Sequence, residues 1–276
     1  MKTSRRARFG LGAAAVAIVF WALAPVVWIV SLSFKQGDDI DNRQFWPTNW
    51  SLDNYRTVFQ THLFTSALRN SLGISLIATV ISVALAVLAA YAVSRLHFPG
   101  KRWVLNGALA VSVFPAISIA TPLFNLWRTI GLYDTWAGLV IPYLALTLPL
   151  AMWTMTSFFR QIPIDLEQAA QVDGATTWQA FRRILLPLAA PGVFTTAILA
   201  FFVAWNDFIF GITLTSTDNA RPVPAALAFF SGASEFQQPT AAIAAASVIV
   251  TIPVVVLVLL FQRRIVAGLT SGAVKG

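Results

Sequence analysis

The sequence has 276 residues, of which 57% are hydrophobic and only 11% are charged, and its mean hydropathy is +0.72. Soluble domains carry about 25% charged residues, so this composition excludes an ordinary soluble enzyme and indicates a membrane protein. The net charge of +8 lies in short Lys and Arg clusters between apolar runs, which favours membrane topology over nucleic-acid binding. Because the chain has no cysteine, a disulfide framework and a cysteine-based metal site are excluded.

Six apolar runs are long enough to cross the hydrocarbon core as helices, which takes about 20 residues. They predict an all-α transmembrane fold, a bundle of six helices in one domain that covers residues 1–276. The expected spans are residues 11–33, 67–96, 103–127, 137–159, 191–214 and 241–261. The first run is expected to be an uncleaved transmembrane helix and not a secretory signal. It is longer than the apolar core of a typical signal, and Pro25 directly follows its one cleavage-like triplet.

The distribution of Lys and Arg predicts the orientation of the chain in the membrane. With the N-terminus in the cytoplasm, thirteen of the nineteen Lys and Arg residues fall on the cytoplasmic side. The six on the outer side are Lys35, Arg43, Arg56, Arg69, Arg128 and Arg221. Both termini are therefore expected in the cytoplasm.

The first outer loop, residues 34–66, is long and acidic. Its aspartates are Asp38, Asp39, Asp41 and Asp53. This loop is a candidate landing surface for an outer protein, and a plain solvated loop is the alternative.

The longest cytoplasmic loop, residues 160–190, is expected to begin as a short helix. Asp165 and Glu167 lie near the expected N-terminus of this helix and complement its dipole. Asp173 and Gly174 then supply a turn in which glycine can adopt positive φ.

A second short helix is expected to follow that turn. Thr176 and Gln179 have the spacing of a capping box, so the helix should start at Thr176. It should continue until Pro187 stops it. An interfacial segment that only connects two spans is the alternative interpretation.

The spacing of small and apolar residues in this loop resembles the EAA loop of bacterial ABC-importer permeases. The matching positions are Ala169, Ala170, Gly174, Ile184 and Pro187. In that family the loop docks on an ATPase subunit and transmits its closure to the membrane helices. The family glutamate falls on Gln168 here, and Glu167 stands one place earlier, so the family's ionic contact is not carried over. The coupling residues that the resemblance implies are Glu167, Gln168, Ala169, Ala170, Asp173, Gly174, Ile184 and Pro187.

The resemblance extends over nearly the whole chain, to the maltose-type carbohydrate permeases. It rests on the segments Trp50–Tyr55, Asn70–Ser71, Arg95–Lys101, Ala204–Phe208 and Gly268–Gly276. It implies a type I ABC-importer permease fold in a bacterial inner membrane. The partners that it implies are a homologous permease subunit, two ATPase subunits and an extracytoplasmic sugar-binding protein. ATP and Mg would bind the ATPase subunits, and this chain would bind no cofactor or metal. The cargo implied is a neutral disaccharide such as trehalose, and the tail residues Ser271, Gly272 and Lys275 would reach toward the ATPase.

Asp207 is the one clear acidic residue within an expected span, and buried charge in a membrane tends to mark function. With Trp205 and Asn206 it is a candidate for the substrate path, where Asp207 would accept sugar hydroxyls and Trp205 would offer a stacking surface. An interfacial aspartate with no role in transport is the alternative. No Lys or Arg lies deep in a span, which favours a neutral cargo.

The sequence contains no phosphate-binding loop of the form G-x-x-x-x-G-K-[ST], so the chain is not expected to hydrolyse ATP. An ion-coupled secondary transporter would have an internal repeat and several ionisable groups in its spans, and neither is visible. An intramembrane enzyme would need a catalytic pair or metal ligands in its spans. Import of another oligosaccharide or of a polyol stays open.

Overall fold

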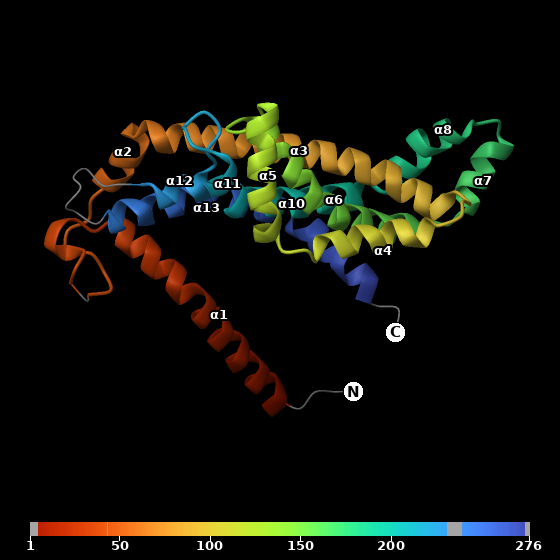
Figure 1. Ribbon diagram of the computed structural model, residues 1–276. Helices are drawn as coiled ribbons and strands as arrows, with labels where there is room; N and C mark the ends of the chain where they lie inside the picture. The colour runs from red at the N-terminus through yellow and green to blue at the C-terminus, as the bar shows by residue number, and fades with distance from the viewer. Residues whose placement is uncertain (1–4, 43, 231–238, 274–276) are drawn as a thin grey trace. The chain divides into compact units, whose positions relative to one another are not determined.

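A computed structural model describes residues 5–42, 44–230 and 239–273, and for residues 5–9, 102 and 262–273 it describes the backbone alone. Every element in these ranges is a helix (Figure 1), as expected for an all-α protein. The first helices are α1 (Arg5–Ser33), η1 (Gly37–Asp39), α2 (Asp53–Gln60), α3 (His62–Arg95), α4 (Lys101–Ser112) and α5 (Ala116–Ile130). There follow α6 (Trp136–Gln161), α7 (Asp165–Val172), α8 (Thr177–Ala180), η2 (Phe181–Leu185) and α9 (Leu186–Leu188). The last are α10 (Ala190–Trp205), α11 (Ile209–Leu214), α12 (Val223–Ala228) and α13 (Thr240–Ala273).

Four helices of the described residues are long and apolar enough to cross a membrane, and the number rises to six if each of two bent pairs forms one span. The four are Gly10–Ser33, His62–Arg95, Trp136–Gln161 and Thr240–Phe261. The chain is therefore a multi-pass membrane protein by the length and composition of its helices.

The expected span 103–127 is not one helix. The segments Trp103–Ser112 and Ala116–Ile130 meet at an angle of 88°. Pro115 lies at this break with φ −67° and ψ 124°. Proline has no N–H to continue the helical ladder, and it restricts the residue before it to extended backbone, so the helix must end there.

The expected span 191–214 is also interrupted. α10 ends at Trp205, and the chain begins the separate helix α11 at Ile209. On the other side, α10 is bent by 70° from the helical segment Thr177–Leu188. The fifth apolar run is therefore built from short helices.

Contacts divide the chain into two compact units, residues 1–65 with 227–252 and residues 66–226 with 253–276. The second unit contains α4 to α11, and its interior has two apolar clusters. One lies around Ile74, Trp127 and Tyr143, and the other around Ala90, Met155 and Phe181. Small residues of α3 help to form this interior: Ser82, Ala86 and Ala90 are each fully buried, as close helix packing in a membrane requires.

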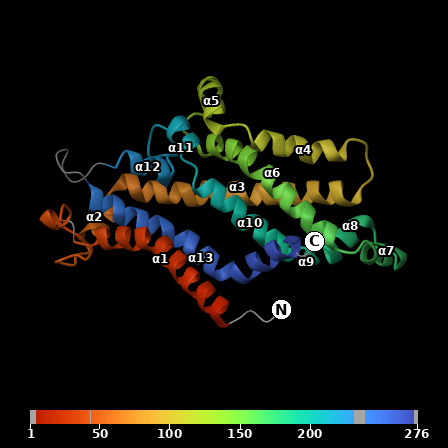
Figure 2. The ribbon, with the colours of Figure 1, turned by 90° about the horizontal axis from the view of Figure 1, so that it is seen from below.

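Within the second unit, α4 and α6 lie side by side, and α7 and α8 project from one end (Figures 1 and 2). We call this the loop end, because the 160–190 loop forms it. The turn before α6 and the segment after α11 meet at the other end, where the Asp134 N–H donates to the Leu214 carbonyl over 3.0 Å. α6 therefore runs between the two ends of this unit.

In the first unit, the chain after α1 is held by a buried lysine. The Lys35 ammonium donates to Asn42 Oδ1 at 3.0 Å and to the Gln44 carbonyl at 2.6 Å. It also lies 5.2 Å from the ring centroid of Trp28, a cation–π contact.

Two of the four aspartates in the 34–66 loop hold the loop itself. Asp39 accepts hydrogen bonds from the backbone and the hydroxyl of Thr48, at 2.8 and 3.0 Å. Asp53 accepts from Gln36 at 2.8 Å and pairs with Arg56 at 3.2 Å. These two carboxylates are engaged within the loop, which leaves only part of the acidic charge for an outer partner.

Candidate functional site

The 160–190 loop forms the two short helices that its sequence predicts. α7 begins at Asp165, and Asp165 and Glu167 both lie in its first turn. Gly174 follows α7 with φ +87°, and its N–H donates to the Gln171 carbonyl over 3.0 Å. Glycine has no Cβ to oppose this left-handed conformation, so the tight turn between the helices depends on it.

The capping box at the start of α8 is present. The Thr176 hydroxyl accepts from the Gln179 N–H at 3.2 Å, and the Gln179 side chain accepts from the Thr176 N–H at 2.8 Å. The helix ends at Leu188, one residue after the expected stop at Pro187, and the chain bends there by 70°. The five residues of η2, which precede α9, form a π-helical turn.

Glu167 points into the protein and binds α3. Its side chain is 9% exposed, and its Oε1 accepts a 2.8 Å hydrogen bond from the Tyr91 hydroxyl. Its Oε2 lies 3.5 Å from Nε of Arg95, whose side chain is 8% exposed. The same guanidinium donates to the carbonyls of Phe159 and Ile162 at 3.1 and 2.7 Å. This Tyr91–Arg95–Glu167 cluster therefore joins the end of α3, the end of α6 and the first turn of α7.

The other candidate residues of the loop divide between its surface and its interior. Those that face solvent in the isolated chain are Gln168, Ala169, Asp173, Gly174 and Pro187. Ala170 is only 7% exposed, and Ile184 is half-buried. Ala169 and Ala170 therefore do not share one open face, since consecutive helical residues point about 100° apart.

The substrate-path candidates lie where α10 ends. Asp207 Oδ2 accepts from the Gly211 N–H at 3.1 Å and so holds the start of α11. The hydroxyl of the buried Tyr143 of α6 lies near Asp207, but it makes no hydrogen bond within the described residues. Asn206 is exposed, and its amide donates to the Phe202 carbonyl at 2.8 Å.

Trp205 differs from its expected role as a stacking surface. It is 2% exposed, and its indole stacks on Phe201 with ring centroids 5.4 Å apart. The ring is covered in this structure because it is part of the helix packing, so a cargo could reach it only after a rearrangement.

The tail candidates lie at or beyond the end of the described chain. Ser271 and Gly272 fall in the last turn of α13, for which only the backbone is described. Lys275 lies outside the described residues. Within the described ranges, no group of three or more His, Cys, Asp or Glu residues is placed to hold a metal ion.

Asn70 makes a second set of long-range hydrogen bonds, which the sequence did not predict. It is fully buried, and its amide donates to the carbonyls of Asp218 and Arg221 at 2.9 and 3.1 Å. Its Oδ1 accepts from the Trp136 indole at 3.1 Å, and the neighbouring Ser71 hydroxyl accepts from the Val223 N–H at 2.7 Å. The pair therefore fixes the segment after α11. The only sign of these hydrogen bonds in the sequence was an uncharged polar pair, Asn70 and Ser71, at the start of an apolar run.

Residues 82–270 match the family described as "Binding-protein-dependent transport system inner membrane component". The chain belongs to this family. It is therefore a permease, the membrane component of a transport system, and the ATPase of such a system is a separate subunit.

Curated relatives match the permease over nearly its whole length. It is 55% identical to the "Trehalose transport system permease protein SugB" of Mycobacterium tuberculosis, over 94% of each chain. It is 40% identical to the "Trehalose/maltose transport system permease protein MalG" of Thermococcus litoralis, over 96% of this chain and 95% of the relative. It is 37% identical to the "Sulfoquinovosyl glycerol transport system permease protein SmoH" of Agrobacterium fabrum, over 92% and 89%.

Solved structures agree on the fold. A chain of a bacterial ABC transporter that imports the acidic polysaccharide alginate matches with a TM-score of 0.80 and 25% identity, over 95% of this chain and 99% of that chain. A chain of an alginate ABC transporter in complex with an alginate-bound periplasmic protein matches with a TM-score of 0.66 and 19% identity, over 92% and 93%. The permease therefore has the fold of ABC-importer permeases, which favours that class over an ion-coupled secondary transporter.

Proposed function

We propose that the permease is a subunit of an ATP-driven importer that moves trehalose, or a closely related neutral disaccharide, into the cytoplasm. The observation that carries this proposal is the 55% identity, over 94% of both chains, to a relative named for trehalose transport. A second relative, at 40% identity, is named for trehalose and maltose. The whole chain, residues 1–276, acts as one permease domain.

The importer contains a homologous permease subunit, two ATPase subunits that bind ATP and Mg, and an extracytoplasmic sugar-binding protein. The family description, which names dependence on a binding protein, supports this assembly. The complex lies in the bacterial cytoplasmic membrane. The excess of Lys and Arg on one side of the membrane supports cytoplasmic termini.

The 160–190 loop is the surface that receives the ATPase. The exposed side chains of Gln168, Ala169, Asp173 and Pro187, with the turn at Gly174, offer the contact. Glu167 has a different part, because its carboxylate is bonded to Tyr91 and Arg95. It transmits the movement of α7 to α3, together with Ala170 and Ile184, which pack inward. The tail residues Ser271, Gly272 and Lys275 form a further contact with the ATPase.

The cargo passes the junction between α10 and α11. Asp207 and the exposed Asn206 are the polar groups there that can bind sugar hydroxyls. Trp205 takes part only when the helix packing around it opens. Two more distant relatives are named for sulfoquinovosyl glycerol and for diacetylchitobiose, so another oligosaccharide or a polyol is the second candidate cargo.

The test is purification of the tagged permease from native membranes, with identification of its companions and measurement of ATPase activity. The proposal predicts recovery of a homologous permease, an ATPase and a sugar-binding protein, with ATPase activity that trehalose stimulates through the binding protein. Stimulation by another oligosaccharide or a polyol but not by trehalose would keep the class and change the cargo. Recovery of the permease alone, without ATPase activity, would contradict the proposal.

A further inference from the structure

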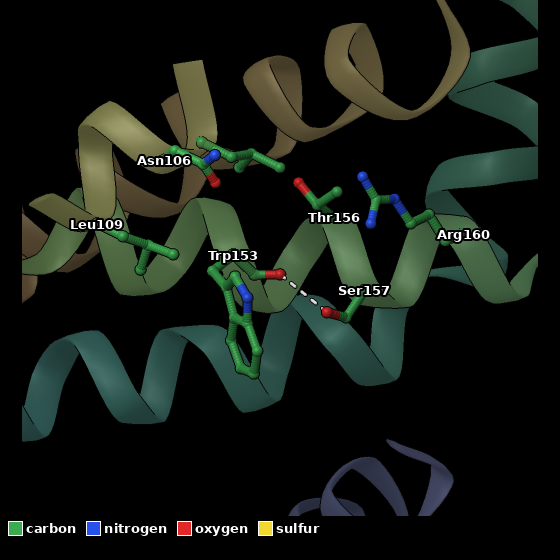
Figure 3. A pocket seen from close by; sticks show the side chains of 7 residues that line it. Asn106, Leu109, Trp153, Thr156, Ser157 and Arg160 are labelled. Atoms are coloured by element: carbon green, nitrogen blue, oxygen red, sulfur yellow. Dashed lines mark hydrogen bonds between the residues drawn. The ribbon is translucent and has the colours of Figure 1, made fainter. Parts of the chain in front are cut away.

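A cavity lies between α4 and α6 near the loop end of the second unit. It has a volume of about 310 Å³, at the lower limit of the roughly 300–1,000 Å³ typical of small-molecule sites. Its polar lining is Asn106 of α4 with Trp153, Thr156, Ser157 and Arg160 of α6, and two leucines of α4 complete it. Figure 3 shows Asn106 reaching from α4 toward the α6 side chains Thr156 and Arg160.

The α6 residues of this lining form one stripe. Trp153, Thr156, Ser157 and Arg160 are spaced at i, i+3, i+4 and i+7, which places them on a single helical face. The Thr156 hydroxyl donates to the Met152 carbonyl at 2.7 Å, and the Ser157 hydroxyl donates to the Trp153 carbonyl at 3.1 Å. Their protons are thus bonded within the helix, while the oxygen lone pairs stay free to accept from a ligand.

Asn106 and Arg160 supply most of the hydrogen-bonding groups of this lining. Both side chains are exposed, and no hydrogen bond or ion pair joins either of them to the part of the chain that the structure describes. An amide offers two donors and an acceptor, and a guanidinium offers five donors. These groups are therefore available to hydrogen-bond a polar ligand in the cavity.

The opposite face of α4 has a different character. Trp103, Val104 and Val111 are 79, 44 and 56% exposed, and all are apolar, as a lipid-facing surface requires. Polarity in α4 is therefore concentrated on the side of the cavity. This contrast supplies matched controls on the same helix.

The chemistry of the lining favours a neutral, hydroxyl-rich ligand over an anionic lipid headgroup. Sites for anionic headgroups use several Lys or Arg residues, and this lining has one cation, Arg160. An amide and two hydroxyls bind groups that both donate and accept, as sugar hydroxyls do. The indole of Trp153, 53% exposed, offers a flat apolar surface for the face of a sugar ring.

We propose that the α4–α6 cavity is a second binding site for the imported sugar, at the loop end of the transport path. Asn106, Thr156, Ser157 and Arg160 bind its hydroxyls, and Trp153 stacks on its ring. This site is separate from Asp207, which lies near Tyr143. Tyr143 lies seventeen residues before Arg160, or about 25 Å along α6 at the helical rise. The inference rests on the proposed function, since it needs a sugar cargo.

The absence of cysteine from the chain allows a direct test. Ser157→Cys places a single thiol in the cavity, and Val111→Cys places one on the opposite face of α4. Each variant is assembled with its partner subunits in lipid nanodiscs, and labelling of this chain by N-ethylmaleimide is followed with and without trehalose. We expect trehalose to slow labelling at position 157 several-fold and to leave labelling at position 111 unchanged. Equal rates at position 157 with and without trehalose would overturn the proposal.

Uptake measurements give a second and independent readout. Trp153→Ala and Asn106→Ala should each lower trehalose uptake about tenfold, which corresponds to about 1.4 kcal/mol, while Trp103→Ala retains uptake. Normal uptake by both cavity variants would refute the second sugar-binding site and leave the proposed function intact. Protection of position 157 by phosphatidylglycerol, without an effect of sugar, would identify a lipid site and also refute it. A wild-type complex that imports no trehalose would instead refute the proposed cargo.

Discussion

The Tyr91 hydroxyl donates a 2.8 Å hydrogen bond to Glu167, a residue 76 positions later in the chain. Arg95, one turn after Tyr91 on α3, lies 3.5 Å from the other oxygen of the same carboxylate. A short surface helix is thus bonded through one acidic side chain to a helix that is long enough to cross the membrane. A movement of α7 must either carry α3 with it or break these bonds.

Glu167→Gln should lower the amount of sugar imported per ATP hydrolysed. Glutamine keeps the size of the side chain and can accept from Tyr91, but it loses the charge that faces Arg95. Hydrogen bonds to charged groups contribute about 1.5–3 kcal/mol, so the link weakens without being removed. The measurement is uptake and ATPase activity in the same proteoliposomes. Asp165→Asn, at an exposed position of the same helix turn, is the control, and equal coupling in the two variants would contradict the prediction.

Tyr91→Phe and Glu167→Gln should act on one interaction. Because the two side chains are bonded, their effects on thermal unfolding of the purified complex should not add. A double-mutant cycle should give an interaction of about 0.5–3 kcal/mol. An interaction energy of zero would show that the contact has no energetic weight.

Replacement of Gly174 should uncouple ATP hydrolysis from transport while leaving membrane insertion intact. A Cβ at this position meets no atom within 4 Å, so the cost arises from φ +87° alone and amounts to about 1–2 kcal/mol for an L-residue. Gly174→Val should impair uptake far more than Gly174→Asn, since asparagine adopts the left-handed conformation more readily. Normal uptake by Gly174→Val would contradict the role of this turn.

Asn70→Ala should loosen the segment after α11. It removes the donor to two carbonyls and the acceptor for the Trp136 indole, and each buried group left unsatisfied costs about 1–3 kcal/mol. Proteolysis between residues 215 and 222 should become faster, and the unfolding temperature should fall. Asn125→Ala, at an exposed position of α5, should leave both unchanged. Similar behaviour of the two variants would show that the hydrogen bonds of Asn70 do not hold the segment after α11.

Acid should loosen the 34–66 loop. Desolvation opposes ionisation of Asp39, but hydrogen bonds from Thr48 and Asn42 and the charge of Lys35 outweigh it, so the pKa of Asp39 lies below its ordinary value. The ionised carboxylate therefore stabilises the loop above about pH 4, and this contribution is lost as the pH falls through the lower folded-state pKa. Hydrogen exchange of the loop, corrected for its intrinsic pH dependence, should rise in that range, and Asp39→Asn should abolish the change.

The sequence predicted those features that depend on local pattern. Apolar runs are recognised by length, so the helices around residues 11–33 and 137–159 agree with the structure to within a few residues. The capping box at Thr176 and the turn at Gly174 depend on neighbouring residues and were also predicted. Prolines were visible, but which of them would break a helix was not: Pro115 lies at an 88° bend, whereas α6 contains Pro142 and continues.

Contacts between residues far apart in the chain could not be predicted from the sequence. Glu167 was expected among the residues that couple the loop to the ATPase, and only its position against Tyr91 reveals its inward bond. Trp205 was expected to face the cargo, and only the packing around Phe201 shows that it is covered. Neither periodicity nor spacing encodes which face of a short helix meets another helix.

The most direct test of the central claim is uptake of radiolabelled trehalose by proteoliposomes that contain this permease, its homologous partner, the ATPase subunits and the binding protein. The account predicts uptake that requires ATP and the binding protein, and that persists when ionophores abolish all ion gradients. Uptake that continues without ATP and collapses with an ion gradient would contradict it.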